Sequence, residues 1–209
     1  PVTTHTMRFI KTFWALDAKL AYSRHYPSIN WMNSYSGYLG DIAKWWGENI
    51  SEDWFGIRNE AYGILQREDT LKEIVKLLGP DALPDEEKLI LEIARMVKIG
   101  LLQQNSFDDV DTYCSPEKQF KLLKLVVDFY KLGQQSLKEG TPLASIRELP
   151  VVTSLLKARM DIKDDEMPKL DQLENDMKEQ FKNISGVKVT NWPLKAEFNT
   201  ARLLKLKDH

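Results

Sequence analysis

A cluster of acidic residues in this chain could in principle bind a metal ion. Asp108, Asp109 and Asp111 offer carboxylate oxygens of the kind that bind calcium. A calcium loop that began at Asp108 would need glycine at its sixth position and glutamate at its twelfth, where Tyr113 and Gln119 stand. We therefore interpret the cluster as solvated or helix-capping carboxylates.

Zinc binding and nucleophilic catalysis have little support in the sequence. His5, His25 and His209 lie far apart, and Cys114 has no CxxC partner, so Cys114 is interpreted as a free structural thiol. The sequence has no GxSxG motif to expose a catalytic serine and no GxxxxGK[ST] or GxGxxG loop to hold phosphates. We expect any ATP-driven function to depend on phosphoryl-transfer residues outside this chain.

The composition is that of an ordinary globular protein. The 209 residues are 43% apolar and 29% charged, and the net charge of -2 gives no field that would steer the chain onto nucleic acid or an anionic membrane. The apolar runs are much shorter than the roughly 20 residues that span a bilayer. One cysteine and the lack of a signal peptide favour a reducing cytoplasmic setting. Because the chain begins at Pro1, we interpret it as a fragment.

Short elements are predicted at the N-terminal end. Aromatic and β-favouring residues over 7–16 predict one strand, whose partners we place upstream of Pro1. Asp17 can cap a short helix over 17–24. The segment 25–38, HYPSINWMNSYSGY, is rich in turn-forming residues and predicts an ordered loop packed on the core. Loops of this kind often hold ligands.

Two long helices are predicted next. The apolar stripe of the first helix comprises Trp54, Ile57, Ala61, Ile64, Leu65, Leu71, Ile74, Val75 and Leu78. Gly79 and Pro80 end this helix, and Pro84 suits the first position of the second. The buried stripe of the second helix comprises Leu89, Ile93, Val97 and Leu101. The short PDALP connection predicts an antiparallel hairpin with a rigid, exposed, acidic tip.

The remaining signals are helical. Ser115 followed by Pro116 predicts the start of a third long helix that runs to about Gly140. A short helix is predicted over 150–160 and a charged helix over 164–183. A candidate short strand follows at 187–192.

Three sequence blocks resemble the C-terminal domain of the catalytic A subunit of archaeal-type and vacuolar-type rotary ATPases. They are FWALDAKLAYSRHYPSINWMNSYSGY, LKEIVKLLGPDALPDEEKLILEIARMVKIGLLQQNSFDDVDTYC and SPEKQFKLLKLVVDFY, in the family's order and spacing. The resemblance is clear over residues 1–140 and weaker through Asn183. It implies a mainly α fold, with a helical-bundle domain over 17–185 that contains the long hairpin. Residues 1–16 would be a strand of the upstream nucleotide-binding domain, and residues 186–209 would be a tail of unassigned role.

The resemblance also implies a role in ATP synthesis or hydrolysis coupled to proton or sodium transport. In that family the phosphate loop, the catalytic glutamate and the ligands of Mg²⁺ lie upstream, and a neighbouring B subunit supplies an arginine. The cofactor would therefore be ATP or ADP with Mg²⁺ held by residues outside this chain, which we expect to be inactive alone. The implied partners are the B subunit, in an alternating A3B3 ring, and the central rotor stalk, without direct nucleic-acid or membrane contact. The implied location is cytoplasmic and peripheral to the membrane.

The resemblance places the adenine end of the nucleotide pocket within this chain. An aromatic pair in the family corresponds to Tyr26, where relatives more often have Phe, and to Phe107. Adenine offers a π-face that stacks on aromatic rings, at roughly 1–3 kcal/mol per contact. Leu101, Gln103 and Ser106 resemble residues that line the base and ribose. We expect these five residues to contact nucleotide, and none of them to be catalytic.

The acidic hairpin tip corresponds to the family's contact with the central rotor. The corresponding residues are Asp81, Leu83, Asp85, Glu86 and Glu87. A rigid helix pair is suited to act as a lever, because closing a pocket at its base swings its tip. These carboxylates would also stabilise the start of a helix in any protein.

Two other interpretations remain open at this point. The chain could be a free-standing helical interaction module that uses the hairpin tip and its tryptophans as a contact surface. It could instead be a small nucleotide-binding regulator that uses the aromatic pair alone, although affinity without phosphate contacts should be poor.

Overall fold

The predicted helical hairpin is present, and its helices end and begin close to the predicted glycine and proline residues. The computed structural model describes residue 6 and residues 8–185. Helix α4 (Trp54–Leu78) ends at Gly79, whose φ of 83° lies in the left-handed region that favours glycine. A 3₁₀ turn, η1 (Pro80–Ala82), then leads to α5 (Asp85–Val97). Pro84 is the N-cap of α5 rather than its first residue, a shift of one position from our prediction.

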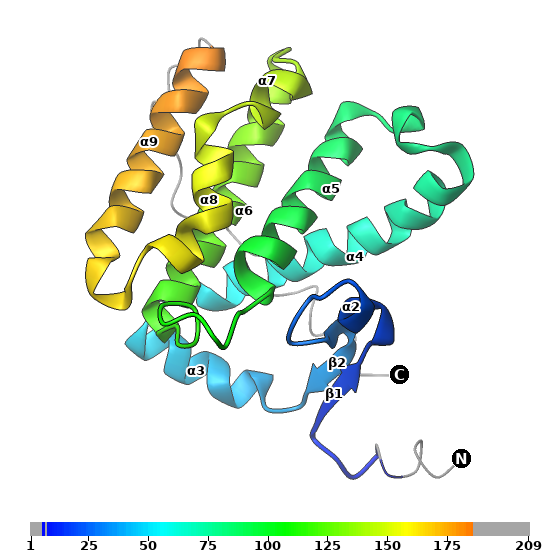
Figure 1. Ribbon diagram of the computed structural model, residues 1–209, viewed down its shortest axis with the longest axis vertical. Helices are drawn as coiled ribbons and strands as arrows, with labels where there is room; N and C mark the ends of the chain where they lie inside the picture. The colour runs from blue at the N-terminus through cyan, green and yellow to red at the C-terminus, as the bar shows by residue number, and fades with distance from the viewer. Residues whose placement is uncertain (1–5, 7, 186–209) are drawn as a thin grey trace.

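The hairpin is only partly embedded in the core. On α4, Ile57, Ala61, Ile64, Leu65 and Leu71 are buried as predicted. Ile74 and Leu78 are exposed, which contradicts the predicted stripe. These residues lie in the last turns of α4, at the hairpin tip, which extends away from the other helices of the bundle (Figure 1).

The N-terminal segment forms a small antiparallel sheet. Strand β1 (Thr12–Leu16) pairs with β2 (Ile29–Ser36), with Leu16 opposite Ile29 and a bulge between Phe13 and Ala15. Helix α2 (Ala18–Tyr22) connects them and is capped by Asp17, which accepts the Lys19 N–H as predicted. Two expectations are corrected: β1 has a partner downstream, and part of the predicted loop over 25–38 is a strand.

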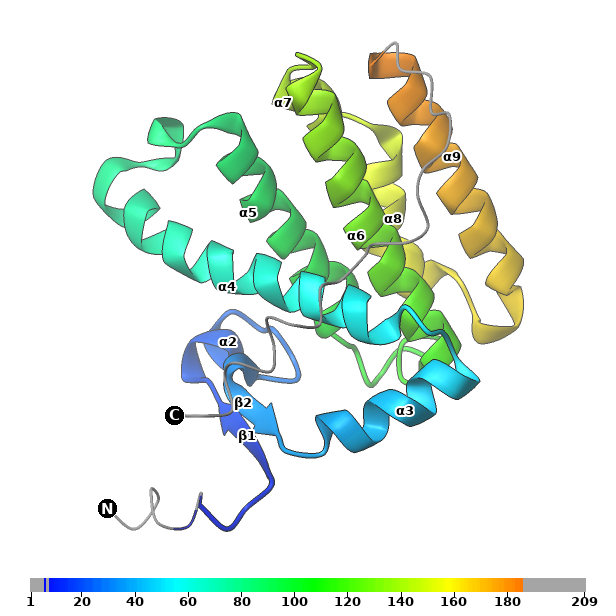
Figure 2. The same ribbon diagram turned by 180° about the vertical axis from the view of Figure 1, so that it is seen from behind.

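The other helices pack around α6 (Pro116–Lys138). This helix contacts α4, α5, α8 (Pro150–Asp161) and α9 (Met167–Ser185), and it occupies the middle of the bundle in both views (Figures 1 and 2). A 3₁₀ turn, η3 (Asp164–Glu166), precedes α9. Helices α3 (Leu39–Asn49) and α7 (Leu143–Arg147) were not predicted. The mainly α fold is confirmed, and the candidate strand at 187–192 lies outside the described residues.

A transition from α-helix to π-helix at the end of α5 leads into the candidate site. The buried stripe of α5 continues as predicted through Leu89, Ile93 and Val97, and the chain then widens into a π-helix, η2 (Lys98–Leu102). Leu101 lies in this turn and is only half buried against the core. The π-helix ends at Gln103, where the loop that carries Phe107 begins.

Candidate functional site

Two segments that are far apart in the sequence meet beside the small sheet. The backbone N–H of Gln104 donates a hydrogen bond to the carbonyl of Tyr26 at 2.7 Å. The Gln103 side chain, 79 positions from Arg24, donates from Nε2 to the Arg24 carbonyl at 3.5 Å. The structure therefore brings together the two segments that sequence analysis assigned to one pocket.

Tyr26 and Phe107 each present a ring at the surface. Tyr26 precedes a cis peptide bond to Pro27, and its hydroxyl donates to the Ala21 carbonyl at 3.5 Å. Phe107 is 96% exposed, and Ser106 beside it is also exposed. Burying a phenylalanine side chain contributes roughly 1.5–3 kcal/mol, so this ring is available to stabilise a bound apolar or aromatic group. Leu101 differs from the other candidates because it packs against the core.

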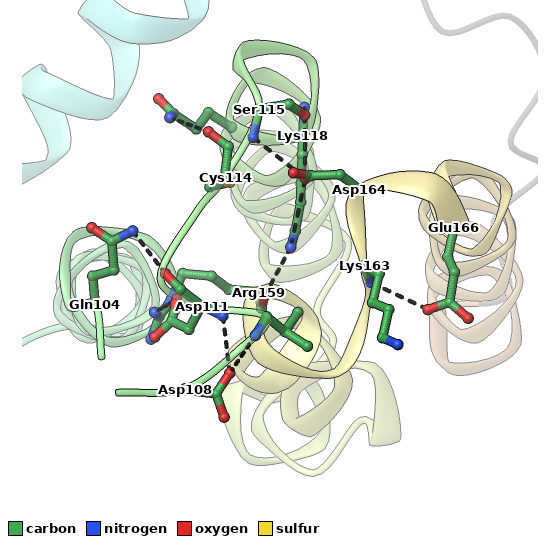
Figure 3. A network of polar contacts seen from close by, with 12 residues as sticks. Gln104, Asp108, Asp111, Cys114, Ser115, Lys118, Arg159, Lys163, Asp164 and Glu166 are labelled. Atoms are coloured by element: carbon green, nitrogen blue, oxygen red, sulfur yellow. Dashed lines mark hydrogen bonds and ion pairs between the residues drawn. The ribbon is translucent and has the colours of Figure 1, made fainter. Parts of the chain in front are cut away.

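The acidic cluster supports the Phe107 loop. Asp108 Oδ1 accepts the N–H groups of Val110 and Asp111, at 3.0 and 2.9 Å, and so stabilises a turn. Asp111 is 1% exposed and forms an ion pair with Arg159 of α8, as Figure 3 shows. Asp111 is therefore neither solvated nor a helix cap, which corrects our interpretation of the cluster. Sequence analysis missed Arg159 because its partner is distant in the chain.

His25, which precedes Tyr26 in the chain, is buried. Its ring packs edge-on against Trp31 with centroids 5.6 Å apart, and its Nε2 has no hydrogen-bond partner among the described residues. Burial lowers the pKa of His25 below its ordinary value, and the nearby charges of Lys98 and Arg159 lower it further. The imidazole is therefore neutral at neutral pH and packs as part of the support for the Tyr26 segment.

A second buried ion pair joins the hairpin to this site. Glu68 of α4 is buried and pairs with Lys98, the first residue of η2. Lys98 Nζ also lies 5.4 Å from the centroid of the Trp31 ring, within range of a cation–π interaction. Lys72, one helical turn after Glu68, lies 3.0 Å from the same carboxylate. Lys98 therefore contacts α4, β2 and the turn that leads to Phe107.

The hairpin tip is acidic but also apolar. Asp81, Asp85 and Glu86 are exposed and Glu87 is half buried, whereas Leu83 is buried in the core and holds the tip in place. Leu77 of α4 is 84% exposed, and Leu78 is exposed beside it. Sequence analysis assigned Leu78 to the buried stripe and did not consider Leu77. Their position directly before Gly79, in the last turn of α4 at the hairpin tip, is the signal that could have identified them.

The described residues contain no group of three or more potential metal ligands. In the same part of the chain, every helix is too short or too polar to cross a membrane. The arrangement beside the sheet offers exposed aromatic faces, amide groups and ordered backbone. These groups can orient a planar ring and its polar edges.

Comparison with known proteins gives consistent results. Residues 43–147 match the family model described as the C-terminal domain of V and A type ATP synthase. The chain is 50% identical over 190 residues to the A subunit of the A-type ATP synthase of Hyperthermus butylicus, and the match covers 90% of this chain. It is 48% identical over 187 residues to the corresponding protein of Ignicoccus hospitalis, covering 88% of this chain. It is 42% identical over 184 residues to a V-type ATP synthase alpha chain of Halothermothrix orenii, also covering 88%. The matched regions are 32%, 31% and 31% of these relatives, so the chain spans about a third of their length.

Proposed function

Because the chain belongs to the family of C-terminal domains of V and A type ATP synthases, we propose that it forms the C-terminal part of a rotary ATPase catalytic subunit. Its function there is to contact the adenine end of bound ATP or ADP and to transmit the resulting movement through the α4–α5 hairpin. The hydrogen bond between Gln104 and Tyr26 carries this proposal, because it joins the two segments that bear the aromatic rings.

The remaining parts of the reaction belong to other segments and chains in this proposal. Residues outside this chain hold the phosphates and Mg²⁺, and a B subunit in an alternating A3B3 ring completes the site. The assembled enzyme couples ATP synthesis or hydrolysis to ion transport, on the cytoplasmic side and peripheral to the membrane. The 209-residue chain alone is inactive.

Substitution of Phe107 tests the adenine contact in the assembled enzyme. Phe107→Ala removes one stacking interaction of roughly 1–3 kcal/mol, so the KM for ATP should rise about 5- to 100-fold with a smaller change in kcat. Tyr113→Ala is a matched control, because Tyr113 is another exposed aromatic residue near the end of the same loop. An unchanged KM for Phe107→Ala would remove this residue from the pocket.

A binding measurement on the isolated chain separates this proposal from a regulatory function. Without phosphate contacts, isothermal titration with ATP should show only weak binding, because stacking alone supplies too little free energy. Saturable micromolar binding would instead indicate a self-sufficient nucleotide-binding regulator.

We further propose that the hairpin tip contacts the central rotor. The exposed Asp81, Asp85 and Glu86 carry the charge, and exposed Leu77 provides apolar surface for a partner. The buried Leu83 and the Glu68–Lys98 ion pair fix the two ends of the lever to the core and to the nucleotide side.

The rotor contact is tested by neutralising Asp85, Glu86 and Glu87 together. The triple variant should bind nucleotide normally but pump fewer ions for each ATP hydrolysed in reconstituted vesicles. Glu48→Gln with Glu52→Gln is the control, since these exposed carboxylates lie at and just beyond the end of α3, away from the tip. Loss of nucleotide binding with intact folding would contradict the lever assignment.

A further inference from the structure

The Phe107 loop is ordered by side-chain hydrogen bonds. The Phe107 N–H donates to Asn105 Oδ1 at 3.1 Å, so Asn105 fixes the position of the Phe107 backbone. The Asn105 N–H donates in turn to Asp111 Oδ2 at 2.6 Å. Gln104 Nε2 donates to the backbone carbonyl of Asp111 at 2.8 Å. Asp111 therefore closes this loop through both its side chain and its backbone.

Asp111 is anchored to the helical bundle through Arg159. Figure 3 shows the two side chains facing one another between the loop and α8. Both are buried, and Arg159 is only 6% exposed. Arg159 Nη2 also donates to the carbonyl of Ile99 in η2 at 3.5 Å. One guanidinium group therefore contacts both the loop and the helical turn that precedes it.

The backbone of Arg159 is held in place by a second buried charge. Lys118, at the start of α6, is fully buried, and its Nζ donates to the Arg159 carbonyl at 3.0 Å. The same Nζ lies 3.9 Å from Asp164 Oδ1, which also accepts the N–H and the hydroxyl of Ser115, at 3.3 and 3.2 Å. The C-terminal end of the loop, at Ser115, is thus connected through Asp164 and Lys118 to Arg159, which also holds Asp111.

We propose that Asp111 and Arg159 are a positioning pair that holds the Phe107 loop in the shape that contacts the adenine ring. The inference rests on the proposed function of Phe107 and goes beyond it. Both side chains are buried. Their effect on the loop passes through the hydrogen bonds that Asn105 and Gln104 donate to the side chain and the backbone of Asp111, rather than through contact with nucleotide. If the pair is broken, the loop populates its binding shape for only a fraction of the time, and the apparent affinity falls by that fraction.

The test uses the assembled enzyme with the complete catalytic subunit. Asp111→Asn removes one charge at nearly constant size, and Arg159→Gln removes the opposite charge and shortens the side chain. Each should raise the KM for ATP about 10-fold, which corresponds to about 1.4 kcal/mol, while kcat changes less than about twofold. The inhibition constant of inorganic triphosphate should not change, because that probe has phosphates but no base. The double variant should raise KM no further than the larger single effect, since both substitutions break the same contact.

A destabilised control distinguishes positioning from general stability. Met177→Ala creates a cavity on α9, because Met177 is fully buried, and it leaves the loop contacts intact. It should lower the melting temperature without raising KM. If Met177→Ala and Asp111→Asn raise KM equally, the effect is general and the positioning role is wrong.

The Phe107→Ala variant, measured in parallel, separates the two proposals. If Phe107→Ala raises KM and Asp111→Asn does not, only the positioning role is overturned. If Phe107→Ala has no effect, the adenine contact and the positioning role both fail, whatever Asp111→Asn does. Should the Asp111→Asn enzyme not assemble, Gln104→Leu removes the partly buried hydrogen bond to the Asp111 carbonyl and leaves the ion pair intact. It should raise KM about threefold through the same population effect, and an unchanged KM would overturn the positioning role.

Discussion

Replacement of Glu68 by glutamine should lower the free energy of unfolding more than most single substitutions of a polar residue do. Glu68 is buried and is the carboxylate partner of both Lys98 and Lys72. The side chain of Lys98 is only 15% exposed. Glu68→Gln therefore leaves a largely desolvated ammonium group without its counter-charge, close to a second positive charge.

The expected size follows from the burial of each partner. Removing one member of a fully buried ion pair costs about 3–5 kcal/mol. Lys72 is about half exposed, so the loss of its ion pair with Glu68 contributes little to the destabilisation. Lys98 retains its contact with the Trp31 ring, which offsets about 1 kcal/mol. The free energy of unfolding should therefore fall by about 2–4 kcal/mol.

Equilibrium unfolding of the 209-residue chain in urea measures this loss. Lys98→Met and the double variant Glu68→Gln with Lys98→Met complete a double-mutant cycle. The double variant should be more stable than the sum of the single effects predicts, by at least about 1.5 kcal/mol, because it leaves no unpaired charge. Glu73→Gln is the matched control. It breaks the exposed Glu73–Lys76 ion pair on the same helix and should not change the free energy of unfolding measurably. Additive single effects, or a Glu68→Gln variant as stable as the unchanged chain, would refute the reasoning.

Three other residues give independent predictions. Because the folded-state pKa of His25 is lowered, unfolded chains take up the proton first as pH falls below about 6.5. Acidification from about pH 7.5 to about pH 5.5 should thus reduce stability by up to about 1.4 kcal/mol per pH unit, and His25→Gln should remove that dependence in urea titrations. Burial raises the pKa of Cys114 to about 11 from an ordinary 9.0, so its reaction with a disulfide reagent at about pH 8 should be about 100-fold slower in the folded than in the unfolded chain. Equal rates would contradict the burial of this thiol. Ser115 Oγ caps α6 by accepting the Lys118 N–H at 3.3 Å and also donates to Asp164, so Ser115→Ala should cost about 1–2 kcal/mol by thermal unfolding, whereas a neutral result would argue against the cap.

The long helices could be predicted from sequence because their signals are local. Gly79, Pro84 and Pro116 mark helix ends through backbone preferences that hold in any context. Strand β2 was missed because Asn30 and Asn33 are typical of turns. In the structure the Asn30 side chain accepts the N–H groups of Met32 and Asn33, so these turn-forming residues are accommodated within the strand.

The supports of the candidate site could not be predicted from local pattern. The motif around Phe107 is visible in the sequence, but periodicity does not relate it to the segment at Tyr26. The ion pairs of Asp111 with Arg159 and of Glu68 with Lys98 join elements that only the tertiary fold brings together. A charged residue on an otherwise apolar helix face is a weak signal for such a pair, because solvent exposure explains most charged residues equally well.

The buried network around Lys118 also affects the order in which the chain can mature on the ribosome. Ser115 is synthesised first, but its acceptor Asp164 lies 49 positions later. At roughly 5–20 residues per second, the polymer is extended for about 2–10 seconds before that acceptor exists. During this interval Lys118 and Asp111 lack the partners that compensate their burial. The Phe107 loop is therefore among the last parts of the nascent domain to take its final form, although its own residues emerge well before the end.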